Sequence, residues 1–268
     1  MSEFWTGFRY YPSAWRFLRK NRLMPWMWAS AIANLILFTL TLYLTWRYAA
    51  DLMAWMSELS GWEQAESGWR YGLQVVLLFL FRVLLVLICL KVYRYLVLTV
   101  MAPVLAYLSE EIQEKETGYH KPFSWSLLWH DSRRGIAVAL INFIMEMGFT
   151  IVIVLAGWLV PILAPFVPPV LFLAESYFFG FSMLYYRNEF LGLSIRESRR
   201  SINRHWGLAM GNGLMFNLML FVPVIGVLIA PVLSLTAAGL AFNQVDNPEK
   251  YADTFQKSLK RKDSQDLR

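Results

Sequence analysis

The chain has 268 residues, of which 57% are hydrophobic and 16% are charged, and its mean hydropathy is +0.41. A soluble domain of this size could not bury so much apolar surface, so the composition indicates an integral membrane protein. The net charge of +6 comes from basic residues that flank apolar segments, as orientation signals do, which argues against a nucleic-acid-binding protein.

Residues 1–22 are predicted to form an amphipathic segment, which Pro12 should kink. Apolar side chains recur at alternating steps of four and three, and basic side chains occupy the other side; the apolar set is Phe4, Phe8, Tyr11, Trp15 and Leu18. This pattern is typical of a helix lying in the headgroup plane. A helix that packs on the rest of the protein would show the same pattern.

Two long transmembrane helices are expected next, over 23–60 and 69–116. The first contains a charge-free run from Leu23 to Trp46, and the second carries Arg82 in mid-span and is interrupted at Pro103. The first apolar run is too long for a signal-peptide core, so we expect no cleavable signal. The stretch 47–70 is acidic, and we place it outside the cell.

Two helical hairpins are predicted over 136–186 and 207–244, each with a pair of prolines eight positions apart at its tip. The prolines are Pro161 and Pro169 in the first hairpin, and Pro223 and Pro231 in the second. The residues between them carry no charge, whereas a turn facing water would carry Asn, Asp or Ser. A helix break of this kind belongs at membrane depth, so we expect both hairpins to penetrate the bilayer halfway. The arms of the first hairpin are longer and could instead span the membrane.

The predicted fold is therefore an all-α integral membrane protein with a single membrane domain over 1–244 and a polar C-terminal tail over 245–268. The N-terminal segment, the Arg-rich segment between the hairpins and the tail are basic. Two crossings followed by two hairpins put all three on one side, which the positive-inside rule assigns to the cytoplasm. Association into a homo-oligomer would cover the short hairpins.

Charged residues inside the apolar runs are costly and indicate a role. Arg82 could bind or pass an anion, with Glu146 or Glu175 as the gating carboxylate. Alternatively, Arg82 and one of these glutamates could form an internal ion pair that only locks the hairpins to the long helix. Four asparagines could line a polar path or join helices; they are Asn34, Asn142, Asn212 and Asn217. No phosphate loop, nucleophile elbow or metal-ligand spacing occurs, so we expect neither an enzyme nor a bound cofactor or metal.

The layout resembles the CysZ-type sulfate permease family, part of the wider etoposide-induced-protein membrane family. The likeness covers the chain to about residue 244 and rests on residues in matching order and spacing: Gly7, Trp15 and Asn34, then Ala102-Pro103, Glu110 and Thr117-Gly118, then the proline pairs. It implies two long transmembrane helices, two half-penetrating hairpins, a membrane oligomer and sulfate uptake.

Two motifs of that family are altered in this chain. The Gly-Leu-x-Ala-Glu stretch reads Ala106-Tyr107-Leu108-Ser109-Glu110, which keeps only the glutamate, and the family's Arg pair falls on Met24-Pro25. These two changes favour a protein of this family that does not transport. If the chain is a permease, the candidate anion path lies near Arg22, Arg82, Ser109 and Glu110.

Two functions follow from these observations. The first is passive transport of sulfate or a related small anion across the bacterial inner membrane. The second is a non-transporting membrane scaffold that shapes the bilayer or binds partners through its amphipathic helices and wedge-like hairpins.

Overall fold

The computed structural model describes residues 3–59, 68–69, 72, 76, 96, 99–122, 124–222, 225–257 and 260, and no strand occurs among them. Within these described ranges, three helical stretches are long and apolar enough to cross a membrane: Met24–Thr41, Trp129–Leu159 and Pro161–Phe190. The chain is an all-α membrane protein. Two compact units are present: one comprises residues 1–33 and 98–268, the other residues 34–97. Arg82 lies outside the described residues.

The N-terminal segment forms two short helices, α1 (Glu3–Arg9) and α2 (Tyr11–Lys20), and the break comes at Tyr10, so that Pro12 lies in the first turn of α2. Proline is favoured in the first turn of a helix, where its missing N–H leaves no bond unmade. The apolar side of α2 packs on the rest of the protein, because Tyr11, Ala14 and Leu18 are all buried. The basic residues of α2 face outward.

Helix α3 (Met24–Leu59) has 36 residues, a length of about 54 Å. In the second unit, the described part of this helix exposes Leu35, Ile36 and Leu40, as a helix surrounded by lipid would. Residues 99–117 form a further helix, which passes through Pro103 without a break and ends at Gly118 with a φ of 74°.

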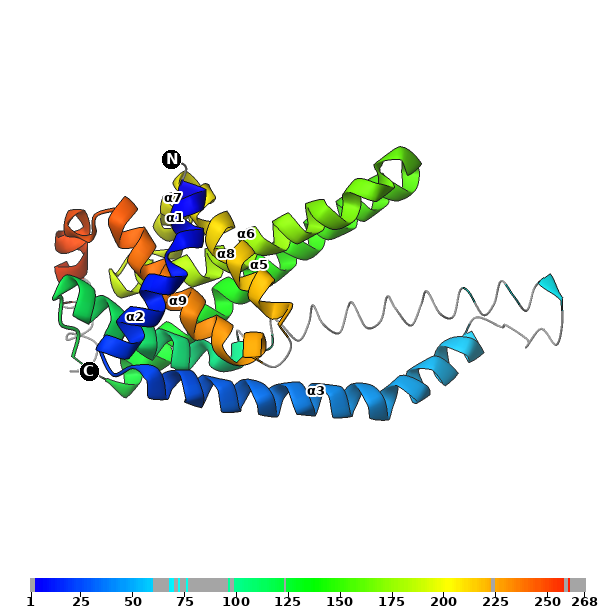
Figure 1. Ribbon diagram of the computed structural model, residues 1–268, viewed down its shortest axis with the longest axis horizontal. Coiled ribbons are helices and arrows are strands. Elements are labelled where there is room, and N and C mark those ends of the chain that lie inside the picture. Colours follow the sequence, from blue (N-terminus) through cyan, green and yellow to red (C-terminus); the bar gives the residue numbers. More distant parts are fainter. Residues whose placement is uncertain are drawn as a thin grey trace. The chain divides into compact units, whose positions relative to one another are not determined.

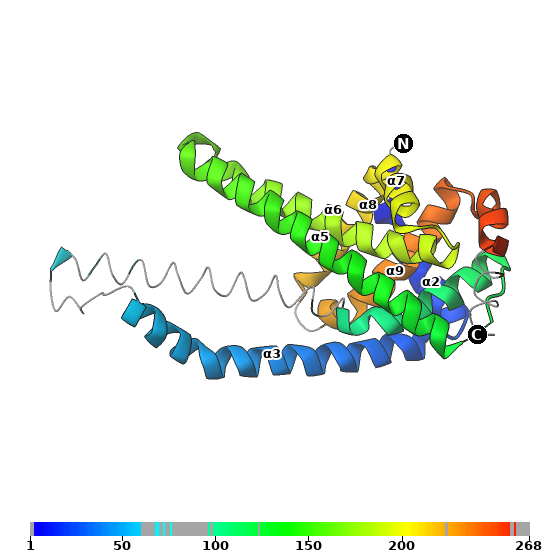
Figure 2. The same ribbon diagram turned by 180° about the vertical axis from the view of Figure 1, so that it is seen from behind.

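The first hairpin consists of α5 (Trp125–Leu159), a 3-10 turn η1 (Pro161–Phe166) and α6 (Val167–Phe190), which run side by side in both ribbon views (Figures 1 and 2). Pro161 opens the turn, and Pro169 lies in the first turn of α6. The helices span about 52 and 36 Å, so each is long enough to cross the ~30 Å bilayer core.

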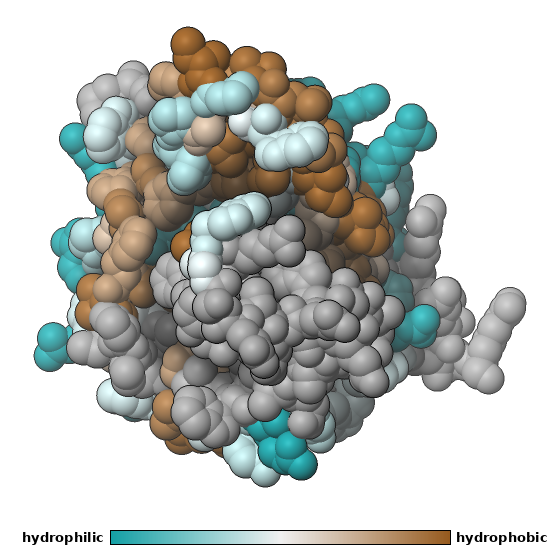
Figure 3. Space-filling view, turned by 90° about the vertical axis from the view of Figure 1, so that its right-hand side faces the viewer, coloured by the Kyte–Doolittle hydropathy of each residue, from teal (hydrophilic) through white to brown (hydrophobic). Residues whose placement is uncertain are grey.

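The tip of the first hairpin is apolar and exposed. Trp158, Ile162 and Phe166 expose 77%, 78% and 62% of their surface, and no residue of η1 is buried. Figure 3 views the molecule from the side of this tip, and apolar residues dominate its upper part. A patch of this kind is stable only in contact with lipid or another protein surface.

The second hairpin is shorter and consists of α8 (Trp206–Leu220) and α9 (Ile225–Val245). Helix α8, with 15 residues, is about 22 Å long and too short to cross the bilayer core. Gly226 approaches α8 so closely that a Cβ there would lie 2.0 Å from the carbonyl oxygen of Met219.

The prediction that Pro231 marks the tip of this hairpin is wrong, because Pro231 lies inside α9. A proline inside a helix loses one hydrogen bond, and here the packing around it holds the chain helical: Ala230 and Val232 are fully buried on either side. The other predicted tip residue, Pro223, lies outside the described residues.

Helix α8 packs between α1 and α6, and glycines allow both contacts. A Cβ on Gly213 would lie 1.7 Å from the carbonyl oxygen of Ser176 on α6, and one on Gly211 would lie 2.0 Å from that of Phe4 on α1. Phe179 and Phe216 stack across the α6–α8 contact. Close backbone approach through small residues is a common way to join helices in membranes, where no hydrophobic force drives association.

Candidate functional site

Several paired charged side chains of the first unit gather at the end of the first hairpin away from its tip. We call this layer the polar head. The end of α6 and the start of α5 meet there with the 110–121 stretch, helix α7 (Ile195–Arg204) and the residues after α9. It contains three basic and four acidic side chains: Lys121, Arg134, Arg187, Glu110, Asp131, Glu189 and Asp246.

Lys121 joins two carboxylates in the first part of the polar head. Its Nζ lies 2.7 Å from Asp131 Oδ2 and also contacts Glu110, while its backbone N–H donates to Glu114 Oε1 at 3.0 Å. Burial alone would lower the pKa of Lys121, but Asp131 and Glu110 together raise it above its ordinary value. Lys121 is therefore a buried cation held charged by its partners.

Arg134 connects the start of α5 to the segment that follows α6. Its Nη2 donates to the carbonyl oxygen of Leu193 at 2.6 Å and to the Tyr185 hydroxyl at 3.0 Å, and its Nε lies 3.6 Å from Glu189 Oε1. These contacts fix the two arms of the first hairpin to each other at the polar head.

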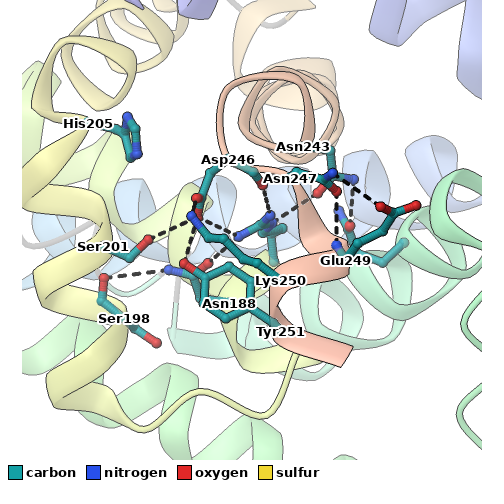
Figure 4. A network of polar contacts seen from close by, with 12 residues as sticks. Asn188, Ser198, Ser201, His205, Asn243, Asp246, Asn247, Glu249, Lys250 and Tyr251 are labelled. Carbon is teal, nitrogen blue, oxygen red and sulfur yellow. Dashed lines mark hydrogen bonds and ion pairs between the residues drawn. The ribbon is translucent and has the colours of Figure 1, made fainter. Parts of the chain in front are cut away.

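Arg187 is the centre of the second part of the polar head and is 1% exposed. Its Nε donates to Asn243 Oδ1 at 2.9 Å, one Nη donates to Asn188 Oδ1 at 2.9 Å and lies 3.3 Å from Asp246 Oδ2, and the other donates to the Asp246 carbonyl. Figure 4 shows Asn188, Asn243, Asp246 and Tyr251 converging there. Tyr251 also donates to Asp246 Oδ2 at 2.9 Å.

These pairs join both hairpins to the residues after α9. Buried charges are costly unless they are paired and hydrogen-bonded, and each of the three cations meets this condition. The described residues contain no group of three or more His, Cys, Asp or Glu side chains suited to hold a metal ion.

Of the predicted path residues, Ser109 and Glu110 lie in the helix over 99–117, where Ser109 is 3% exposed and Glu110 belongs to the Lys121 cluster. Arg22 is exposed in the turn between α2 and α3, with a φ of 57°. The rings of Trp26 and Tyr107 lie 4.7 Å apart, so the start of α3 packs on the Glu110 helix.

The predicted charge partners both lie in the first hairpin. Glu146 is buried within α5, and Glu175 is half-buried within α6. Whether either faces Arg82 stays a prediction, because Arg82 is not among the described residues.

The asparagines of the hairpins join helices. Asn142 donates to Ser182 Oγ at 3.0 Å between α5 and α6, Asn217 donates to Ser176 Oγ at 2.9 Å between α8 and α6, and Asn212 accepts from Ser234 Oγ at 2.8 Å between α8 and α9. Of the two roles considered for them, the structure therefore supports helix association.

Sequence reasoning missed the centre of the polar head. Neither Arg187 nor Lys121 was among the predicted site residues, and both are buried. A signal was present: Arg187 ends an apolar helix in the first hairpin, and Asn243 and Asp246 end the corresponding helix of the second. Complementary polar groups at equivalent helix ends are candidates for contact.

Residues 10–231 match the family described as sulfate transporter CysZ/etoposide-induced protein 2.4. The chain belongs to this family. The matched range begins with α2 and extends to Pro231 within α9, so it includes most of the polar head. No curated protein matches the chain.

Proposed function

We propose that this CysZ-family protein is a passive permease for sulfate or a related small anion, acting without catalytic chemistry. The observation that carries the proposal is the family match over residues 10–231. The structure supports it with apolar helices long enough for a membrane and with a polar head that contains Glu110, next to the buried Ser109.

The path we propose passes Arg22, Ser109 and Glu110, and the sequence adds Arg82 as a further candidate residue. Arg22 is exposed and has no ion-pair partner among the described residues, so its guanidinium can attract an anion. The positive charge of Lys121 compensates the negative charge of Glu110 in their ion pair, which lowers the repulsion that an anion would meet there.

Sulfate uptake into proteoliposomes tests this proposal. Purified protein is reconstituted, and uptake of radiolabelled sulfate is measured with chloride and phosphate as competitors. We expect saturable uptake that Arg82→Gln abolishes and Arg22→Gln reduces, while both variants stay folded and assembled. Arg47→Gln, an exposed arginine outside the proposed path, is the matched control and should retain flux. Absence of flux above empty liposomes, from folded and inserted protein, would overturn the proposal.

A membrane scaffold is the second candidate, and the exposed apolar tip of the first hairpin favours it. A wedge inserted into one leaflet changes the shape of a bilayer. For a scaffold, we expect electron microscopy to show that the reconstituted protein deforms liposomes, and the uptake assay to show no anion flux. Deformation that disappears with Ile162→Ser and Phe166→Ser would assign it to the tip.

We further propose that the protein is a homo-oligomer in the bacterial inner membrane, with both termini in the cytoplasm. Exposed basic residues on α2 and α7 support this orientation: Arg16, Arg19, Lys20, Arg196 and Arg200. The short α8, which cannot cross a bilayer alone, supports association between copies.

A further inference from the structure

An open pocket of about 660 Å³ lies between α2, the end of the helix over 99–117 and the end of α9. Its walls are mixed. Arg16, Lys20 and Gln244 are among the polar lining residues, and Phe17, Leu240 and Pro248 form apolar wall. None of the residues proposed for the anion path lines it, so the pocket is a separate feature of the molecule.

Two cations of the pocket lack a counter-charge. Arg16 and Lys20 are four positions apart on α2, so they lie on the same side of the helix, and both are exposed. Arg16 donates to the Pro12 carbonyl and to Ser13 Oγ, each at 3.4 Å. Across the described residues, no carboxylate lies within 4.0 Å of either cation. The single acid in the lining, Glu116, leaves the pocket with an excess of positive charge.

The polar floor of the pocket is held in place by the polar head. Asn243 accepts from Arg187 Nε at 2.9 Å and donates to Gln113 Oε1 at 2.8 Å. Gln244 Oε1 accepts a hydrogen bond from the Tyr10 hydroxyl, which leaves the amide N–H groups of Gln244 as donors. Burial and the nearby Glu116 raise the pKa of Tyr10, so this hydroxyl stays protonated and keeps its donor role. Fixed donors lower the cost of binding a ligand.

The size and walls of the pocket indicate what it binds. Pockets of roughly 300–1,000 Å³ hold drug-sized ligands, and a small inorganic anion would leave most of this space filled with water. An oxyanion matches the donors of Arg16 and Lys20, and an apolar or aromatic group matches Phe17 and Leu240.

We propose that this pocket binds an organic anion, with a sulfate- or phosphate-type group on Arg16 and Lys20 and an apolar body against Phe17 and Leu240. The same chemistry is offered by a soluble amphipathic anion and by the headgroup region of an anionic phospholipid. The site does not depend on sulfate transport, because binding here needs neither the path residues nor a gradient.

Calorimetric titration of the full-length protein in neutral detergent tests the site, with 4-nitrophenyl sulfate as the probe. We expect saturable binding that is about tenfold weaker or more in the Arg16→Gln/Lys20→Gln variant, since hydrogen bonds to charged groups are lost. Arg19→Gln removes an exposed charge from the same helix outside the pocket and should bind like the unmodified protein. Inorganic sulfate and 4-nitrophenol each lack one half of the probe and should bind more weakly.

A second arm identifies the source of the anion. The protein is placed in nanodiscs of phosphatidylcholine with or without phosphatidylglycerol, and the titration is repeated. Competition by phosphatidylglycerol would assign the site to a lipid, and unchanged probe affinity would assign it to a soluble anion. Either result supports the site if the Arg16→Gln/Lys20→Gln variant loses the corresponding binding. Equal binding by that variant, or no saturable binding of the probe together with no effect of phosphatidylglycerol, would overturn the proposal, whatever the result of the flux assay.

Discussion

Arg187 shows how a buried cation can hold several elements together. A guanidinium has five N–H donors in a fixed plane, and here they reach Asn243, Asn188, and both the side chain and the carbonyl of Asp246. The rings of Phe242 and Tyr251 lie 4.6 and 5.5 Å from the guanidinium carbon. A lysine offers three donors from one point and could not reproduce this arrangement.

Substitution of Arg187 should therefore lower the stability of the protein strongly, even when the new side chain keeps the positive charge. Removing one partner of a buried pair costs about 3–5 kcal/mol, because the other charge is left unpaired. We expect Arg187→Leu to lower the melting temperature in detergent strongly and Arg187→Lys to lower it less. The double variant Arg187→Leu/Asp246→Leu should recover part of the loss. A double variant as unstable as the sum of its singles would show that the pair does not act as a unit.

Lys121 allows a test with a pH dependence. Its folded-state pKa is raised, so its contribution to stability is present below its unfolded pKa of about 10.4 and is lost as pH rises through the folded pKa. We expect Lys121→Met to cost about 3–5 kcal/mol at pH 7 and less as the pH rises through the folded-state pKa. Lys115→Met is the control: Lys115 is exposed, 3.7 Å from Glu111, and such a pair contributes below about 1 kcal/mol. Denaturation of each variant over a pH series measures the difference.

At the scale of elements, the contact between α6 and α8 depends on two glycines. A Cβ on Gly180 would lie 1.9 Å from the carbonyl oxygen of Ala209, and one on Gly213 would lie 1.7 Å from that of Ser176. Both obstacles are backbone atoms of the neighbouring helix, which cannot rotate away as a side chain could. The helices must separate to admit even a methyl group.

We therefore expect Gly213→Ala to destabilise the protein and to weaken the Asn217–Ser176 bond across the same contact. The matched control is Gly148→Ala, since Gly148 lies in α5 with nothing within 4 Å of its Cβ position. Alanine is the better helix former by about 1 kcal/mol, so the control should keep or raise stability. Equal melting temperatures for the two variants would contradict the close packing.

Helix α7 begins with a capping box, in which Ser194 Oγ accepts from the Glu197 N–H at 3.3 Å and the Glu197 carboxylate accepts from the Ser194 N–H at 2.9 Å. Hydrogen bonds from Ser194 lower the pKa of Glu197. The lowered pKa means that the Glu197 carboxylate stabilises the folded state. This stabilisation is present above the unfolded pKa of about 4.3 and is lost as the pH falls through the folded-state pKa. We expect Ser194→Ala to cost about 1 kcal/mol at pH 7, and hydrogen exchange of α7 amides to show the change.

At the scale of the whole molecule, the sequence predicts the class of fold well and the polar head poorly. Long apolar runs and a charge-free proline tip are local patterns, and the helices of both hairpins follow from them. The polar head depends on contacts between residues far apart in sequence, such as Arg187 with Asp246 and Lys121 with Asp131. Pro231 was assigned to a break because proline disfavours helices locally, whereas the packing around α9 determines its conformation.

The orientation in the membrane is a property of the whole chain that labelling can test. The sequence has one cysteine, Cys89, so Cys89→Ala gives a background without thiols. Single cysteines are then introduced by Arg19→Cys, Gln64→Cys and Arg200→Cys. Because basic residues remain in the cytoplasm, we expect a membrane-impermeant maleimide to label positions 19 and 200 in inverted vesicles, and position 64 in spheroplasts. Labelling of position 19 or 200 from the periplasmic side would reverse the proposed orientation and would place the organic-anion pocket, whose cations lie on the same helix as Arg19, on the outer face.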